Sequence, residues 1–199
     1  MVEIDSMEKK SLRRKIRSTA IKSSIVRTIS DPYSKRILSN VIDKDPVQVL
    51  SRTPKIISAL VRGLSKNEIH KSMKKRTWSI AQIMAHLCDS EIVVSYRIRK
   101  AIAESGTNIQ AFDQNKWAAH LQYGVTDFRA KLALFSLLRQ DTIDLLQSLT
   151  ARQWKLYGIH EERGKETVAR MAQMYAGHDV NHIKQIQDLG KTIRGRRGL

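Results

Sequence analysis

Apolar residues recur at steps of three and four in four separate segments, and this spacing places side chains on one face of a helix. Clean apolar–polar alternation, which would predict strands, does not extend over several residues in the sequence. Four amphipathic segments of about 20 residues, joined by loops, predict an all-α protein with the architecture of a four-helix bundle. The segments span residues 46–64, 79–104, 126–149 and 167–189.

The chain before the first segment is more polar and strongly basic. Residues 1–45 contain 11 Lys and Arg against 6 Asp and Glu. Apolar residues at loosely helical spacing over residues 1–30 are compatible with one amphipathic helix, which Asp31-Pro32 would break. We therefore expect a basic N-terminal extension that includes a helical segment, followed by a linker over residues 31–45.

The charge of the chain is concentrated at its two ends. The formal net charge is +17, and the extension together with residues 191–199, a basic C-terminal tail, carries nine of these charges. This distribution favours nucleic acid or an anionic surface as a partner. A solvated basic surface gives the same charge count, however, and aromatic residues are not interleaved with the basic ones. The bundle itself is expected over residues 46–190.

Cysteine usage and hydropathy suggest a compartment. Cys88 is the single cysteine, which excludes an internal disulfide framework and fits a reducing environment. The sequence contains no apolar run of membrane-spanning length and no apolar segment typical of a secretory signal. We therefore expect a cytoplasmic protein that does not enter a membrane.

The last segment carries two histidines inside its apolar stripe. Burying an imidazole without a partner costs about 1–3 kcal/mol, so both rings need partners. Their i,i+4 spacing lets both reach one metal ion. Hydrogen bonds within the core would satisfy the same rings, and the spacing alone leaves both interpretations open. The stripe consists of Val168, Met171, Tyr175, His178, His182, Ile186 and Leu189.

A third histidine, His86, lies beside the apolar stripe of the second segment and is followed by Asp89 and Glu91. Together with the pair on the fourth segment, it would supply three nitrogen ligands from facing helices of a bundle. Three histidines leave one tetrahedral position of a metal ion open, as in catalytic sites. A hydrogen-bonded residue at the flank of the core is the alternative interpretation of His86.

Two motifs in these helices resemble the DinB-like superfamily of DinB and YfiT-type proteins. They are WSIAQIMAHLCDSE at residues 78–91 and GHDVNHIKQI at residues 177–186, and the resemblance extends over about residues 46–190. It implies a four-helix bundle, often dimeric, in which three histidines hold a divalent ion such as nickel or zinc. Carried over position by position, the implied metal ligands are His86, His178 and His182.

The resemblance also implies classes of reaction. Some members of the superfamily are bacillithiol or mycothiol S-transferases or a maleylpyruvate isomerase, and others carry the name metal-dependent hydrolase. We therefore expect a homodimeric, metal-dependent enzyme of the hydrolase or thiol S-transferase type that acts on a small molecule, with a low-molecular-weight thiol as a cosubstrate in the second case. The alternative is a non-catalytic interaction protein whose basic ends bind nucleic acid or an acidic partner.

Other polar residues are given supporting roles. Asp179 and Glu91 could orient the ligand rings by accepting N–H bonds, or they could be exposed helix charges. His160 matches a position of the superfamily but falls in a connection between helices, where a structural or supporting role is expected before a ligand role. His70 and His120 are expected to be exposed to solvent.

The remaining candidates are expected to pack rather than react. Cys88 should lie in the core, pointing away from His86, with a role as a thiolate as the minor alternative. The three tryptophans should act as packing anchors rather than stacking platforms. The Tyr175 hydroxyl, one turn before His178, should lie near the mouth of the site. The tryptophans are Trp78, Trp117 and Trp154.

Overall fold

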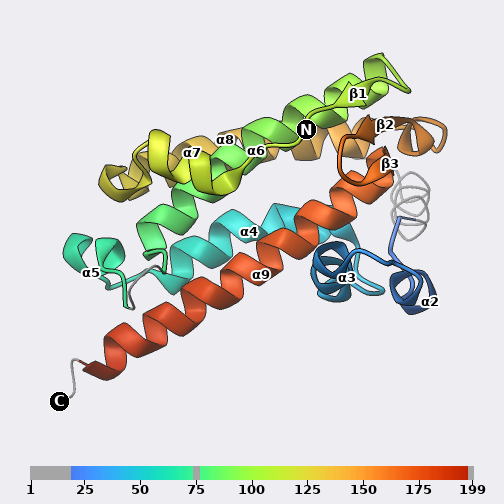
Figure 1. The fold of residues 1–199 in the computed structure, drawn as a ribbon. Coiled ribbons are helices and arrows are strands. Elements are labelled where there is room, and N and C mark those ends of the chain that lie inside the picture. Colours follow the sequence, from blue (N-terminus) through green and yellow to red (C-terminus); the bar gives the residue numbers. More distant parts are fainter. Residues whose placement is uncertain (1–18, 74–76, 197–199) are drawn as a thin grey trace, which may run out of the picture.

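Four long helices form the body of the protein in the computed structural model, which describes residues 19–73 and 77–196. α4 packs along α9 and α6 packs along α8, so the helices form two layers that face each other (Figure 1). This arrangement confirms the predicted four-helix bundle. The helices are α4 (Pro46–Leu60), α6 (Ile80–Ala103), α8 (Phe128–Ser148) and α9 (Val168–Gly195).

Side-chain caps explain where the long helices begin. The Ser79 hydroxyl accepts from Gln82 N–H while the Gln82 side chain accepts from Ser79 N–H, which is a capping box at the start of α6. Thr167 caps α9 with a single bond, in which its hydroxyl accepts from Arg170 N–H. α9 continues past Leu189 to Gly195, so it enters the segment that the sequence suggested as a tail.

Short helices complete the connections between the long ones. Ser65 and Glu68 form a capping box at the start of α5. These elements are α5 (Lys66–His70), α7 (Gln114–His120) and the 3₁₀ helices η1 (Tyr123–Val125) and η2 (Gln153–Lys155). Within the two described ranges, no helix has the length and apolarity needed to cross a membrane.

The segment expected as a linker contains a helix, and that part of the prediction is wrong. α3 (Pro32–Ser39) begins at the Asp31-Pro32 pair that we expected to break helical structure. The Asp31 carboxylate accepts from two backbone N–H groups of the first turn, and proline at the first helical position needs no N–H partner. Of the helix expected over residues 1–30, residues 1–18 lie outside the described residues, and the described part contains the short helix α2 (Ser23–Arg27).

α3 lies directly on α9 because a glycine lets the two helices approach. A Cβ atom on Gly177 would lie 2.2 Å from the Ile37 carbonyl oxygen. Asn40 Nδ2 donates to the Gly177 carbonyl oxygen at 3.1 Å, and Arg36 donates to Asn181 Oδ1 at 3.0 Å. These contacts fix α3 beside the part of α9 that carries His178, and Figure 1 shows α3 next to the N-terminal half of α9.

A small sheet stands beside the N-terminal end of α9, so the expectation of a protein without strands is wrong. Its order is β1-β2-β3, with β1 parallel and β3 antiparallel to β2. The strands are too short for the sequence to show an alternating pattern. They are β1 (Asn108–Ile109), β2 (Tyr157–His160) and β3 (Gly164–Thr167). Gly158 is needed here because a Cβ atom would lie 2.1 Å from the Ile109 side chain.

The core of the bundle divides into two apolar clusters with a polar layer between them. One cluster surrounds Leu50 and Met171, and the other surrounds Met84 and Phe135. On each long helix, one or more buried polar side chains lie between the residues of the two clusters. These side chains are Thr53 on α4, Glu91 on α6, Arg139 on α8, and His178, Asp179 and His182 on α9, and they are joined by His86 of α6, which is flanked by Met84 and Leu87 of the second cluster and contacts His178.

Candidate metal centre

Three histidine rings meet inside this polar layer. His86 reaches from α6, and His178 and His182 reach from successive turns of α9. His178 Nε2 lies 3.0 Å from His86 Nε2 and 3.1 Å from His182 Nε2. All three residues are at most 9% exposed. The structure thus brings together the three residues that the sequence suggested as ligands, with their Nε2 atoms directed at a common point.

The environment keeps these rings in their neutral form. Burial, and then the charge of His182, lowers the pKa of His86 to about 3. Burial also lowers the pKa of His178 well below its ordinary value, and it lowers the pKa of His182. A neutral imidazole has one nitrogen lone pair available, which is the state that binds a metal ion.

Hydrogen bonds alone do not satisfy the cluster. His182 Nδ1 lies 2.7 Å from Gln185 Oε1, which accepts its proton and leaves His182 Nε2 with a lone pair. His86 Nδ1 and His178 Nδ1 are buried, and no hydrogen-bond partner for them is found among the described residues. The interpretation of all three as hydrogen-bonded core histidines therefore leaves two ring nitrogens without partners, at a cost of about 1–3 kcal/mol each.

The spacing of the Nε2 atoms fits one divalent ion. With a metal–nitrogen distance of 2.0–2.1 Å, two ligands are about 3.3 Å apart at a tetrahedral angle and about 2.9 Å apart at a right angle. The observed separations of 3.0 and 3.1 Å lie between these values. Three imidazoles on one side of such an ion would leave its other side open to water or substrate.

Aromatic residues border the cluster. The Trp78 ring packs against His86 at 5.0 Å between centroids, which agrees with its expected packing role. The Tyr175 ring lies 6.1 Å from the His178 ring, close to the site as expected, and its hydroxyl accepts from Arg97 at 3.2 Å. Burial raises the pKa of Tyr175, so the hydroxyl keeps its proton.

Two cavities meet at the histidine cluster. The first, of about 430 Å³, is lined by His86 and His178 and by a set of polar residues at the sheet end of the bundle. The second, of about 610 Å³, is lined by His178 and His182 and also by Trp78 and Leu189. His178 therefore faces both spaces, and a small molecule in either cavity would contact the cluster.

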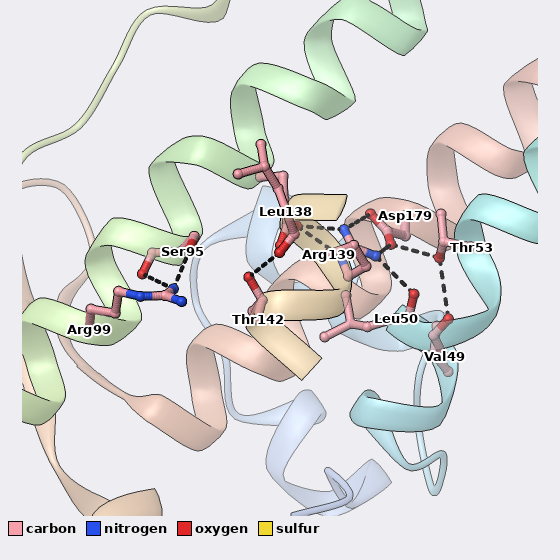
Figure 2. A network of polar contacts seen from close by, with 10 residues as sticks. Val49, Leu50, Thr53, Ser95, Arg99, Leu138, Arg139, Thr142 and Asp179 are labelled. Carbon is pink, nitrogen blue, oxygen red and sulfur yellow. Dashed lines mark hydrogen bonds and ion pairs between the residues drawn. The ribbon is translucent and has the colours of Figure 1, made fainter. Parts of the chain in front are cut away.

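Glu91 and Asp179 have neither of the two expected roles. Both are 1% exposed, and both bind the buried guanidinium of Arg139: Glu91 at 2.8 Å and Asp179 at 2.5 Å. Figure 2 shows that Asp179 lies between Arg139 and Thr53, whose hydroxyl donates to Asp179 at 2.7 Å. Burial opposes the charge of Arg139, but the two carboxylates outweigh it and raise its pKa.

Arg139 is a site residue that the sequence reasoning missed. Its signal was present, because Arg139 follows Phe135 by four residues on the apolar face of the third segment. A cation on a buried face requires buried anions from other helices. Glu91 and Asp179, which the sequence analysis had already singled out on two other helices, were candidates for these buried anions.

His160 lies in a strand rather than in a loop, which corrects its expected place. It is the last residue of β2, 2% exposed, and it lines the first cavity but is not one of the three converging histidines. Its Nδ1 accepts from Glu162 N–H at 3.2 Å. Burial, and then the positive charge of Arg163, lowers its pKa. In the neutral ring the proton is therefore on Nε2, available as a donor.

Of the remaining expectations, the one for His70 is wrong, and those for His120 and Cys88 are confirmed. His70 is half-buried, with its ring nitrogens 2.8 Å from the Lys66 carbonyl oxygen and 2.9 Å from that of Thr126, so it is not the exposed residue we expected. His120 is exposed as expected. Cys88 is fully buried in the core, and burial raises the pKa of its thiol to about 11, which makes it a poor nucleophile.

Comparison with known proteins agrees with this geometry. The family model of the DinB superfamily matches residues 50–186. A protein of Oceanobacillus iheyensis named "Putative metal-dependent hydrolase" is 24% identical over 154 residues, which are 77% of this chain and 89% of that protein. "Putative metal-dependent hydrolase YfiT" of Bacillus subtilis is 25% identical over 149 residues, 74% of this chain and 83% of that protein.

A solved structure supports the fold. The structure of YfiT from Bacillus subtilis, which has an unusual four-helix bundle topology, matches with a TM-score of 0.69 and 24% sequence identity. The match covers 74% of this chain and 85% of the other. At this level of identity, the likeness shows that the two chains share their fold.

Proposed function

The chain belongs to the DinB superfamily, and from this premise we propose that it is a metal-dependent enzyme whose His86, His178 and His182 bind one divalent ion, nickel or zinc. The observation that supports this proposal most directly is the convergence of three neutral Nε2 atoms in a buried cluster, at 3.0 and 3.1 Å. The two unpartnered Nδ1 atoms of the same cluster support it further, because hydrogen bonding does not account for these rings.

Hydrolysis is the reaction type that we propose first. When bound, the ion would act as a Lewis acid and lower the pKa of a bound water toward neutrality. The residues of the chain would bind and orient the substrate in the first cavity, which His86 and His178 line. There His160 offers an Nε2–H donor, and the Trp78 ring packs against His86. Relatives that carry the name metal-dependent hydrolase agree with this reaction type.

Elemental analysis of the purified protein tests the proposal. We expect about one nickel or zinc ion per chain in the wild type after reconstitution with either metal, and loss of the ion in His178→Ala, because His178 is the central ring of the cluster. His120→Ala is the matched control, since His120 is exposed. Absence of a tightly bound divalent ion from the wild type, before and after reconstitution, would remove the proposed function.

Thiol transfer is a second candidate, and the pair of cavities favours it. One reactant in each cavity would bring two molecules together at His178, which lines both. In such a reaction the sulfur of a low-molecular-weight thiol forms a bond to an electrophilic carbon. A leaving group such as chloride departs with the bonding electrons, and the thiol proton passes to solvent.

Two assays on the metal-loaded protein separate the candidates. Hydrolysis of 4-nitrophenyl acetate without added thiol favours the first, and thiol-dependent release of chloride from 1-chloro-2,4-dinitrobenzene favours the second. In either case the rate must fall in His178→Ala and persist in His120→Ala. A rate that is equal in wild type and His178→Ala would mean that the cluster does not take part.

A further inference from the structure

Arg97 is a buried cation that faces the first cavity. It is 4% exposed, and it lies on α6, the helix that also carries His86. No carboxylate in the described parts of the chain lies within the 4.0 Å ion-pair distance of its guanidinium. Arg139, which is buried to the same degree, binds two carboxylates. A buried guanidinium without an anion is costly, because the desolvation of its charge is not offset.

The groups that hold Arg97 are neutral. It donates to the Tyr175 hydroxyl at 3.2 Å and to the Gln110 carbonyl oxygen, and its guanidinium lies 5.8 Å from the centre of the Phe112 ring. These contacts use two of its five N–H groups. They fix the guanidinium in place, and none of them neutralises its charge.

Of the other charged residues of this cavity, three have polar partners of their own, and the fourth, Glu162, forms no ion pair with Arg97. Arg163 makes two hydrogen bonds to Glu166, at 2.8 and 3.0 Å. Asp31 and Asp113 accept backbone N–H groups at the starts of α3 and α7. The cavity therefore combines a histidine cluster at one place with a fixed guanidinium at another that pairs with no carboxylate of the described residues, and the Tyr175 ring lies between them.

We propose that Arg97 binds a carboxylate group of the substrate in the first cavity and so positions the rest of that molecule at the histidine cluster. This inference rests on the proposed function, and it adds the substrate class: a small organic acid. A carboxylate matches the planar fork of a guanidinium and would supply the missing negative charge. In a site shielded from water, such a charge-assisted pair is stronger than it would be at the surface.

Binding of succinate to the metal-loaded protein, measured by calorimetry at low ionic strength, tests the inference. Succinamide, which is uncharged, and inorganic phosphate serve as comparison probes. We expect Arg97→Gln to weaken succinate binding about tenfold or more and Arg97→Lys to weaken it less, because lysine retains the charge without the fork. Arg99→Gln is the matched control on the same helix, since Arg99 pairs with the exposed Asp141.

The outcomes distinguish a binding role from a structural one. A purely structural Arg97 would lower the melting temperature in Arg97→Gln and leave the succinate affinity of the folded protein unchanged, which would overturn the inference. Binding of succinamide as tight as that of succinate would also overturn it. Tighter binding of phosphate than of succinate, dependent on Arg97, would overturn the assignment to a carboxylate.

The metal content of each sample separates this inference from the proposed function. If the wild type holds a divalent ion and Arg97→Gln holds the same amount but binds succinate equally well, the inference alone fails. If the wild type holds no ion while succinate still binds in a manner that depends on Arg97, the proposed function alone fails. Repeating the titration on chelator-treated protein provides this second comparison.

Discussion

At the scale of single residues, three neutral imidazoles in one buried cluster make the metal-free protein sensitive to acid. Burial lowers the pKa of His86 from 6.5 to about 3 and lowers those of His178 and His182 in the same direction. The unfolded chain takes up protons at these residues below about pH 6.5, whereas the folded chain does not. Their contribution to stability is therefore present above that pH and is lost as the pH falls toward the folded-state values.

We predict that the chelator-treated protein loses stability between pH 7 and pH 5, by about 2 kcal/mol for a histidine with the pKa of His86. Thermal unfolding followed by circular dichroism at several pH values measures the effect. His86→Gln should show a smaller decrease over the same range, and His120→Gln, at an exposed position, should behave as the wild type does. An identical pH dependence in all three proteins would contradict the prediction.

Residues whose role follows from a pattern within one helix could be identified from the sequence, whereas residues whose role depends on distant partners could not. His178 and His182 stand one turn apart in a single apolar stripe, so their shared direction follows from helix geometry. Their meeting with His86 followed from the family resemblance. Arg139 and Arg97 were missed because their roles depend on partners far away in the sequence: Asp179 lies 40 residues from Arg139, and Tyr175 lies 78 residues from Arg97.

At the scale of elements, the docking of α3 on α9 depends on Gly177. A Cβ atom there would lie 2.2 Å from the Ile37 carbonyl oxygen and 2.8 Å from its carbonyl carbon, and backbone cannot move aside as a flexible side chain can. Because His178 is the next residue, any displacement of α3 occurs beside the histidine cluster. Tyr33 of α3 also lines both cavities that meet there.

We predict that Gly177→Ala destabilises the protein by about 1–3 kcal/mol, in the range of other substitutions that overpack a tight contact. The midpoint of urea unfolding measures the change. Gly195→Ala in the same helix is the matched control: a Cβ atom there meets no atom within 4 Å, and alanine is the better helix former. If both variants have the midpoint of the wild type, the close approach of α3 to α9 is not a constraint on the fold.

The long helices could be predicted from the sequence because each has a continuous apolar stripe and a recognisable cap. α3 was missed because Asp31-Pro32 is compatible with both a break and a helix start, and the burial of Ile37 and Leu38 against α9 decided between them. The sheet was missed because its strands have two to four residues. The pairing of β1 with β2 joins residues about 50 positions apart, such as Asn108 and Ile159.

At the scale of the whole molecule, the four long helices share one polar layer between two apolar clusters. Arg139 of α8 contacts the Leu50 carbonyl oxygen on α4, Glu91 on α6 and Asp179 on α9. These partners from every long helix fix how the helices are rotated and shifted relative to one another. The same layer holds the three histidines, so their convergence depends on this alignment. The homodimer, the cytoplasmic location and binding of nucleic acid or an acidic partner by the basic ends stay predictions.

Arg139 is the only cation in the described parts of the chain that pairs with Glu91 and Asp179. Its removal leaves Glu91 and Asp179 as buried carboxylates without a cation, and we expect Arg139→Ala to lower the free energy of unfolding by about 3–5 kcal/mol. Arg99→Ala is the matched control, because the Arg99–Asp141 pair is exposed and should contribute about 0–1 kcal/mol.

Urea unfolding measures both free energies. The metal content of the folded variants shows whether a change in the alignment of the helices also weakens metal binding by the three histidines. If Arg139→Ala does not fold, Arg139→Lys serves instead, because it keeps the charge and loses the contacts to more than one partner. Arg139→Lys should unfold at a lower urea concentration than the wild type. It should also bind nickel or zinc more weakly, although residue 139 is not one of the three converging histidines. Equal losses in Arg139→Ala and Arg99→Ala would show that the polar layer does not align the bundle.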